Sequence, residues 1–273
     1  MLVSHSHRFV FLKTRKSAST SVEMLLEPFC RDDGGPVTEA TPQRISDAGI
    51  VGSRLTGRRK GDRFFNHLSA VRIAERIGPE TFDAYARIAT VRNPFAVALS
   101  LFGFMAGTRY PSTKAGFLLH RAWFRRWVAA RSHRPYFGDN AIVRREGRLI
   151  VDHFVRFEHL EADLAALGAT LGIEIDTSAL PATKRSKGRR DRFAIAEFYD
   201  EATADAVRTR YAWAFERIGY STRPEDAAAP PPFPRHPVRG AGSGETVPPE
   251  NGMNPFLGAT IGAVGLQHHE VIQ

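Results

Sequence analysis

The stretch His7–Met24, HRFVFLKTRKSASTSVEM, gives the clearest indication of the fold. After His7 and Arg8 come four apolar residues, Phe9–Leu12, which have the length and residue types of a buried strand. Polar and charged residues follow, then the five small residues Ser17–Ser21, and an apolar helical pattern begins at Val22. A strand, a loop of small residues and a helix start suit a phosphate, because loop amides and first-turn N–H groups lack intrahelical partners. An ordinary strand–helix turn with a Ser or Thr cap has the same pattern.

The details of this loop separate it from the phosphate loop of nucleoside triphosphatases, GxxxxGK[ST]. It has no glycine, and Lys16 precedes the small residues. The order Lys-Ser-Ala-Ser-Thr-Ser after a strand resembles the 5′-phosphosulfate loop of sulfotransferases that use 3′-phosphoadenosine 5′-phosphosulfate (PAPS). In carbohydrate-type members that loop often reads PKTGSTS. Here a basic residue stands where proline is usual, and Ala18 stands where glycine is common, which matters if that position needs a positive φ.

A second segment, Tyr85–Phe102, has a related design. Its apolar run predicts a buried strand at 88–91, and Pro94 suits the first position of a helix behind it. Arg92 ends the strand, and Ser100 lies two turns into the helix. This resembles the Arg-[Asp/Asn]-Pro-x5-Ser segment of sulfotransferases, whose arginine and serine bind the 3′-phosphate of PAPS. A guanidinium offers a planar fork to a phosphate, although a strand-end arginine and a buried helical serine are also common structural features. Both motifs in this order favour the sulfotransferase interpretation.

The composition is that of a basic globular protein. The chain has 273 residues, 42% of them hydrophobic, and 38 Lys and Arg against 29 Asp and Glu give a net charge of +9. Such an excess suits nucleotides, acidic glycans, nucleic acid or an anionic membrane surface, and also an ordinary solvated basic face. Cys30, the single cysteine, favours a reducing compartment and is expected to be an inert thiol. We see neither a signal-peptide core nor an apolar segment of membrane-spanning length, so we expect a soluble cytoplasmic protein.

Two further segments bear on the site. Residues 30–63 are rich in Gly, Pro and charge and read as a long loop, with a short strand at Gly49–Val51, that acts as a lid or is disordered. His67 precedes Ser69, a natural N-cap, at a strand–helix junction. A lone histidine is usually structural, but several carbohydrate sulfotransferases have a histidine or glutamate base at this point, and HLSA resembles that segment.

The second half of the chain carries weaker signals. Residues 103–150 contain an aromatic and basic helix around 117–128, which is equally suited to an acceptor-binding wall and to core packing. A third strand is predicted within 151–158, where Arg156 and Glu158 are interpreted as structural. The basic loop 184–192 reads by itself as a solvated or nucleic-acid-binding patch. The sulfotransferase resemblance implies that Lys187, Gly188 and Arg189 there close over the nucleotide.

The chain end divides into two parts. The final helix, up to Tyr220, resembles the end of the sulfotransferase domain, with Ala214 in place of an aspartate, so any pairing made by that aspartate is lost. Residues 221–273 are rich in Pro, Gly and Ala, and we expect them to form a disordered tail. Residues 1–220 are then the PAPS-binding domain.

The resemblance covers roughly residues 8–220 and implies a P-loop-like, three-layer α/β/α fold with a mostly parallel central sheet. Alternation of strands and helices predicts an α/β fold independently. Ligands of such sheets bind at the carboxyl ends of the strands, where Lys16 and Arg92 are expected.

The resemblance also implies a reaction: transfer of the sulfuryl group of PAPS to a hydroxyl of a carbohydrate or glycolipid-like acceptor, releasing adenosine 3′,5′-bisphosphate. Lys16 would neutralise the leaving oxygen, and His67 would act as general base, with Glu23 in reserve. The 5′-phosphate would be held by Ser17, Ala18, Ser19, Thr20 and Ser21, and the 3′-phosphate by Arg92 and Ser100. No metal is expected, because no cluster of ligand spacing is present.

Two other functions remain open from the sequence. One is a nucleotide-binding protein of this fold without activity. The other is a basic nucleic-acid-binding protein, which would explain the charge of +9 and the 184–192 loop but not two separate strand–loop–helix anion sites. We therefore expect no specific nucleic-acid partner. A kinase-like P-loop enzyme would need a Walker lysine and a Mg²⁺-binding acid, and neither is evident.

Overall fold

The computed structural model describes residues 1–55, 61–108, 110–181 and 192–231. The chain divides into two units, Met1–Gly240 and Ala241–Gln273, and every described residue lies in the first. The predicted nucleotide-binding residues Lys187, Gly188 and Arg189 lie outside the described part of the chain.

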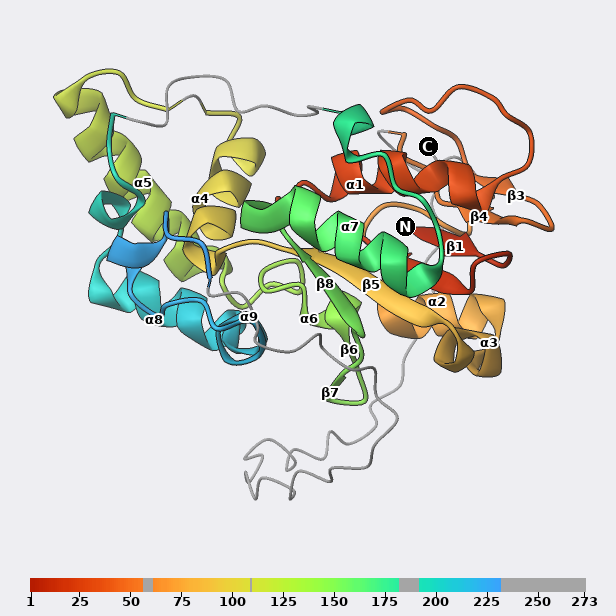
Figure 1. The fold of residues 1–273 in the computed structure, drawn as a ribbon. Helices are drawn as coiled ribbons and strands as arrows, with labels where there is room; N and C mark the ends of the chain where they lie inside the picture. Colours follow the sequence, from red (N-terminus) through yellow and green to blue (C-terminus); the bar gives the residue numbers. More distant parts are fainter. Residues whose placement is uncertain (56–60, 109, 182–191, 232–273) are drawn as a thin grey trace, which may run out of the picture. The chain divides into compact units, whose positions relative to one another are not determined.

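The main sheet has six strands in the order β3-β4-β1-β2-β5-β8 (Figure 1). The strands are β1 (Leu2–Ser4), β2 (Phe9–Leu12), β3 (Arg44–Ile45), β4 (Gly49–Val51), β5 (Ala86–Val91) and β8 (His153–Arg156). The pairs β2/β5 and β5/β8 are parallel, whereas β1/β2, β1/β4 and β3/β4 are antiparallel. The sheet is therefore mixed, and the expected parallel arrangement is confined to β2, β5 and β8. The short strands β6 (Arg144–Arg145) and β7 (Arg148–Leu149) form a separate hairpin.

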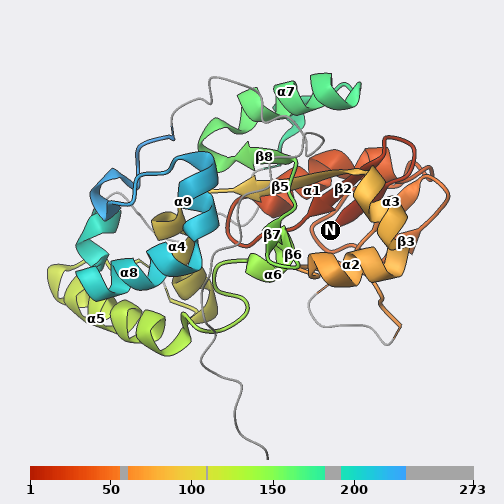
Figure 2. The ribbon, with the colours of Figure 1, turned by 90° about the horizontal axis from the view of Figure 1, so that it is seen from below.

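Helices cover both faces of the main sheet (Figures 1 and 2). They are α1 (Ser19–Leu26), α2 (Ala70–Ile77), α3 (Pro79–Ala84), α4 (Pro94–Met105), α5 (Lys114–Arg131), α6 (Asn140–Val143), α7 (Leu160–Leu171), α8 (Glu201–Arg210) and α9 (Ala212–Ile218). Because side chains alternate along a strand, β2 serves two cores. Phe9 and Phe11 pack with α1 and α7, while Val10 and Leu12 pack in a larger core with α2, α4, α5, α8 and α9. The predicted mixed α/β class is confirmed.

The parallel strands bring three chain segments to one edge of the sheet. Leu12 pairs with Ala89, and Val91 pairs with Arg156, so β2, β5 and β8 end side by side. The loop before α1, the turn before α4 and the turn before α7 therefore begin at the same edge. This edge is the place where α/β sheets bind ligands.

The aromatic helix around 117–128 was expected to be either an acceptor-binding wall or part of the core. The structure decides this for one face of α5. Its inner face, including Phe117, Phe124 and Trp127, is buried in the larger core. Phe102 of α4 and Phe198 pack edge-on against Phe124 in the same core. Core packing therefore accounts for this face, while the outer face of α5 remains exposed.

Other expected elements match the structure closely. The strand at Gly49–Val51 is present as β4, and the Ser69 side chain caps α2 by accepting a hydrogen bond from the Arg72 amide. The packed region extends beyond Tyr220, where the sequence places the start of the tail. Pro224 and Ala227 are buried, and the Pro231 carbonyl lies 3.1 Å from His159 Nε2.

Candidate functional site

The loop between β2 and α1 is held to β5 by a network of hydroxyl groups. Thr14 Oγ1 donates to the Thr90 carbonyl at 2.6 Å, and it lies 2.9 Å from both Thr90 Oγ1 and Ser17 Oγ. Ser17 Oγ is also 2.8 Å from Thr90 Oγ1, and Ser19 Oγ donates to the Thr14 carbonyl at 2.6 Å. The hydroxyls of Ser17 and Ser19 therefore shape the loop, which leaves its backbone amides as the groups available to an anion.

The backbone of this loop is tightly curled. Lys16 and Ala18 have φ values of 59° and 60°, while Ser17 between them has a negative φ. A left-handed residue next to a right-handed one turns successive N–H groups toward one concave side that can bind an anion, and the two left-handed residues of this loop suit such a concavity. Ala18 is also the N-cap residue of α1, and its side chain makes no capping bond. The position does have a positive φ, so alanine in place of glycine is strained here by about 1–2 kcal/mol.

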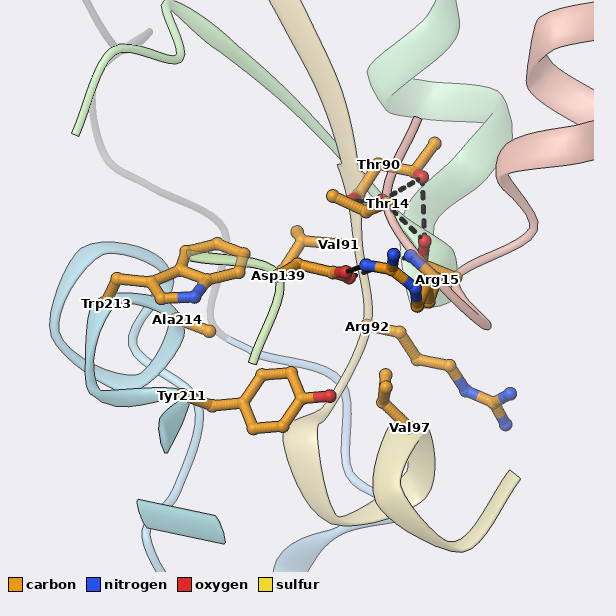
Figure 3. Close-up of a pocket in the computed structure, with 11 residues that line it drawn as sticks. Thr14, Arg15, Thr90, Val91, Arg92, Val97, Asp139, Tyr211, Trp213 and Ala214 are labelled. Carbon is orange, nitrogen blue, oxygen red and sulfur yellow. Dashed lines mark hydrogen bonds and ion pairs between the residues drawn. The ribbon is translucent and has the colours of Figure 1, made fainter. Parts of the chain in front are cut away.

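Arg15 is clamped by a buried carboxylate from a distant segment. Asp139 accepts hydrogen bonds from the Arg15 amide at 2.7 Å and from Arg15 Nη1 at 2.5 Å (Figure 3). Burial raises the pKa of Asp139, and the charge and hydrogen bonds of Arg15 oppose that rise. Asp139 itself has a φ of 52° and precedes α6, while the Trp213 indole donates to the Gly138 carbonyl at 2.8 Å. The clamp therefore ties the loop to both α6 and α9.

Lys13 and Glu23 belong to a buried ion cluster. Lys13 Nζ donates to Glu23 Oε2 at 2.5 Å and to Asn66 Oδ1 at 2.8 Å, and the Met1 amino group also contacts Glu23. Burial alone would raise the pKa of Glu23, but the Met1 ammonium, Lys13 and Arg54 hold it at about 2. Glu23 is fully buried and ionised, so the structure does not present it as the reserve base considered from the sequence.

His67 contacts the same loop. Its Nδ1 lies 2.9 Å from the Lys13 carbonyl, and because a carbonyl accepts, Nδ1 carries the hydrogen and Nε2 keeps its lone pair. Burial, with the charges of Arg15 and Lys13, lowers the pKa of His67 to about 3 despite this hydrogen bond. The ring is therefore neutral at neutral pH. Nε2 is therefore unprotonated, as in a general base, but a pKa of about 3 makes the ring a weaker proton acceptor than a histidine whose pKa lies near the working pH.

Lys16 and Arg92 approach the edge from two different strands. Lys16 Nζ lies 4.5 Å from the centroid of the Phe104 ring of α4. The Arg92 guanidinium stacks on Phe157, with Cζ 4.1 Å from the ring centroid. Both cations therefore lie against aromatic rings beside the curled loop.

The turn that carries Arg92 is rigid. Asn93 caps α4 by accepting from the Phe95 amide at 3.0 Å, and its own amide donates to Glu158 Oε1 at 3.0 Å. Glu158 Oε2 in turn accepts from the Tyr220 hydroxyl at 2.7 Å. Glu158 thus joins the turn that carries Arg92 to Tyr220, which follows α9, in agreement with a structural role. Arg156 has a comparable role, since its Nε donates to Asp163 of α7 at 2.8 Å.

A small pocket lies between the loop and the Arg92 turn (Figure 3). It is lined by Thr14, Arg15, Ser17, Thr90, Val91, Arg92, Val97, Asp139, Tyr211, Trp213 and Ala214. The pocket has room for about one water-sized group, so it is too small for a whole nucleotide. The buried Tyr211 hydroxyl points into it, and no described residue satisfies its hydrogen bond.

Several of these residues were missed from the sequence, namely Thr14, Thr90, Asp139, Tyr211 and Trp213. For Asp139 a signal existed: it is the first acidic residue after Asp83, in a stretch otherwise rich in Lys and Arg. Thr14 and Thr90 each lie in or next to a predicted strand end, but nothing in the sequence pairs them. Tyr211 and Trp213 read as core residues of the last helix.

The structure brings most of the predicted residues together. Lys16, Ser17, Ala18 and Ser19 form the curled loop, Thr20 and Ser21 lie in the first turn of α1, and Arg92 leaves the neighbouring strand. His67 joins them through the Lys13 carbonyl. Ser100 is buried within α4 and is not among the residues that line the pocket.

Comparison of the chain with protein-family models, with curated proteins and with solved structures gave no match. The proposals below therefore rest on the geometry of this chain. Within residues 1–55, 61–108, 110–181 and 192–231, no His, Cys, Asp or Glu cluster could hold a metal ion. No helix in that part of the chain has the length and apolar character needed to span a bilayer.

Proposed function

We propose that this protein binds PAPS and transfers its sulfuryl group to a hydroxyl of a carbohydrate or glycolipid-like acceptor, releasing adenosine 3′,5′-bisphosphate. One observation carries the proposal. The parallel pairing of β2 and β5, with Leu12 opposite Ala89, places both motifs of the sulfotransferase resemblance at one sheet edge. The proposal includes the finer fold assignment, a P-loop-like three-layer domain, which the helices on both faces of the sheet support.

Two segments meet at the sheet edge: the curled loop with the first turn of α1, and the turn that carries Arg92. They differ in ways that suit the two phosphates of PAPS. The curled loop and the first turn of α1 offer backbone amides and the positive end of a helix dipole to the 5′-phosphosulfate. Arg92 offers a guanidinium fork to the 3′-phosphate, the group that distinguishes PAPS from other adenine nucleotides. Ser100, Lys187, Gly188 and Arg189 are assigned to the nucleotide through the resemblance alone.

The transfer step needs charge neutralisation and a proton acceptor. The acceptor oxygen forms a bond to sulfur while the bond from sulfur to the bridging oxygen breaks, so negative charge develops on the 5′-phosphate. Lys16 lies at the loop where that charge would develop. The acceptor proton would pass to Nε2 of His67, the ring nitrogen that the Lys13 carbonyl leaves unprotonated.

The test is calorimetric titration of the chain with adenosine 3′,5′-bisphosphate and with 5′-AMP. We expect selective binding of the bisphosphate, a loss of at least about tenfold in Arg92→Ala, and unchanged binding in Arg72→Ala, an exposed arginine of α2. Lys16→Ala should keep measurable bisphosphate binding but lose release of bisphosphate from PAPS. Binding of neither nucleotide would refute the proposal, and steeply salt-dependent binding of generic DNA in its place would favour the nucleic-acid alternative.

A further inference from the structure

Exposed apolar side chains are concentrated on two neighbouring helices. Among the described residues, seven large hydrophobic side chains are exposed, and five of them belong to α4 and α5. These five, which we call the outer apolar surface, are Phe104, Met105, Leu118, Leu119 and Trp123. Leu119 is 75% exposed, Phe104 68% and Trp123 48%. Exposed apolar residues are normal when scattered, but a concentration of this kind marks an interaction site.

The two helices that carry these residues adjoin each other. Figures 1 and 2 both show α4 beside α5. Trp123 of α5 packs edge-on against Phe102 of α4, with ring centroids 5.4 Å apart. Phe104 lies on another side of α4 from the buried Phe102, and its ring contacts the Lys16 ammonium of the curled loop.

Helix α5 has basic residues and no acidic one, although Asp200, next to α8, forms an ion pair with its Arg125. The sequence contains no Asp or Glu between Asp83 and Asp139, whereas the same interval contains Arg87, Arg92, Arg109, Lys114, Arg121, Arg125, Arg126, Arg131 and Arg134. Five of these nine belong to α5, and Arg126 lies exposed on the same side of the helix as Leu119 and Ala122. An apolar helix face with a tryptophan, accompanied by cations and no acidic residue, is the pattern of a helix that lies in a membrane interface.

From this combination we propose that the outer apolar surface docks on an anionic phospholipid bilayer. The apolar side chains would enter the headgroup region, with the tryptophan at the interface, and the basic residues would contact lipid phosphates. A second copy of the chain is a poorer occupant, because α5 has basic residues and no Asp or Glu, so two copies of this helix would bring like charges together. The proposal is independent of the nucleotide site, since lipid binding needs neither PAPS nor an acceptor.

The experiment is co-sedimentation of the full chain with vesicles of phosphatidylcholine, with and without phosphatidylglycerol, in the absence of nucleotide. We expect the chain to pellet with the phosphatidylglycerol vesicles, to remain in solution with phosphatidylcholine alone, and to dissociate as salt increases. Leu119→Ser should weaken binding about tenfold, and Arg126→Glu should weaken it by at least about fivefold.

Matched controls come from α2, which has an exposed apolar residue, Val71, and an exposed arginine, Arg72. Val71→Ser and Arg72→Glu should bind vesicles like the wild type. Equal losses in these controls, or no pelleting at low salt, would overturn the proposal. A concentration-dependent dimer that Leu119→Ser abolishes would overturn it in favour of self-association. Bisphosphate affinity of Leu119→Ser, measured by calorimetry, should match the wild type, which separates this outcome from failure of the nucleotide site.

Discussion

At the scale of single residues, Ala18 is the clearest case of local strain at the site. Its φ of 60° is a left-handed conformation that glycine adopts without steric cost. We predict that Ala18→Gly raises the free energy of unfolding by about 0.5–1 kcal/mol, because relief of about 1–2 kcal/mol of strain exceeds the added entropy of the unfolded chain. Urea unfolding of the two proteins measures this difference.

The control for Ala18 is the same substitution in a regular helix. Ala122 lies exposed in the interior of α5, so Ala122→Gly should lower the free energy of unfolding by about 1 kcal/mol. Destabilisation of similar size in both variants would contradict the strain at Ala18.

His67 is a second residue with a measurable signature. Its folded pKa of about 3 lies below the ordinary 6.5, so between these values the unfolded chain binds a proton that the folded chain does not. The contribution of His67 to stability is therefore complete above about pH 6.5 and is lost as the pH falls below it. We predict that wild type loses about 1–2 kcal/mol more than His67→Asn between pH 7 and pH 5, whereas His120, His153 and the Met1 amine, whose pKa values are also lowered, act in both proteins. Asparagine tolerates the φ of 58° at this position and does not titrate.

The measurement for His67 is urea unfolding of wild type and variant at a series of pH values. Carboxylates such as Glu23, whose pKa is lowered to about 2, change the stability only below about pH 4.5, which is outside the range from pH 7 to pH 5. Parallel stability profiles of the two proteins from pH 7 to pH 5 would show that His67 is not the titrating group.

At the scale of structural elements, the clamp between the curled loop and α6 can be compared with a clamp of the same design elsewhere. Asp139 accepts from the amide and guanidinium of Arg15. Asp152 likewise accepts from the amide and guanidinium of Arg87, at the opposite end of β5 from Arg92. One clamp thus adjoins the proposed phosphate site, and the other does not.

We predict that Asp139→Asn weakens adenosine 3′,5′-bisphosphate binding by about tenfold, or about 1.4 kcal/mol, because the loop amides lose their fixed orientation. Asp152→Asn should leave that affinity unchanged while lowering the free energy of unfolding by about 1–3 kcal/mol. Calorimetry and urea unfolding give the two quantities. If both variants bind the nucleotide as the wild type does, the Arg15 clamp does not position the loop.

At the scale of the whole molecule, the chain beyond Tyr220 contributes to the packed unit. Pro224 and Ala227 are buried, and Arg208 Nε donates to the Thr222 carbonyl at 2.8 Å. We predict that truncation after Tyr220 lowers the free energy of unfolding by about 2–3 kcal/mol, since it exposes the core surface that these residues cover.

Truncation after Pro231 is the control for this boundary. It keeps every described residue, and the removed segment is dominated by Pro, Gly and polar residues, so we expect a change within about 0.5 kcal/mol. Equal stability of the two truncated chains would place the end of the folded unit at Tyr220, as the composition alone suggested.

Much of the fold could be predicted because it depends on local patterns. The run Phe9–Leu12 forms β2, the small residues after Lys16 lead into α1, and Gly49–Val51 forms β4. Capping of α2 by Ser69 and of α4 by Asn93 follows from hydrogen bonds within two or three residues along the chain. Propensity and caps act over such short distances, so the sequence contains them directly.

The features that the sequence did not predict depend on backbone conformation and on contacts between distant segments. The strand β1 (Leu2–Ser4) was missed, and it makes half of the sheet antiparallel by pairing with β2 and β4. The strain at Ala18 was left open, since a residue name does not report its φ. Glu23 was considered as a base, whereas its burial beside Lys13 depends on the packing of α1 on the sheet.

The sequence by itself determined the strands β2, β4, β5 and β8, the loop of small residues before α1, and the position of Arg92 at the end of its strand. The tertiary structure decided which of these segments meet. Arg15 and Asp139 are 124 positions apart, and Thr14 and Thr90 are 76 apart, yet each pair is in hydrogen-bond contact. Such partners cannot be read from local pattern, because strand order and helix packing bring them together, and these follow from burial of apolar surface across the whole unit.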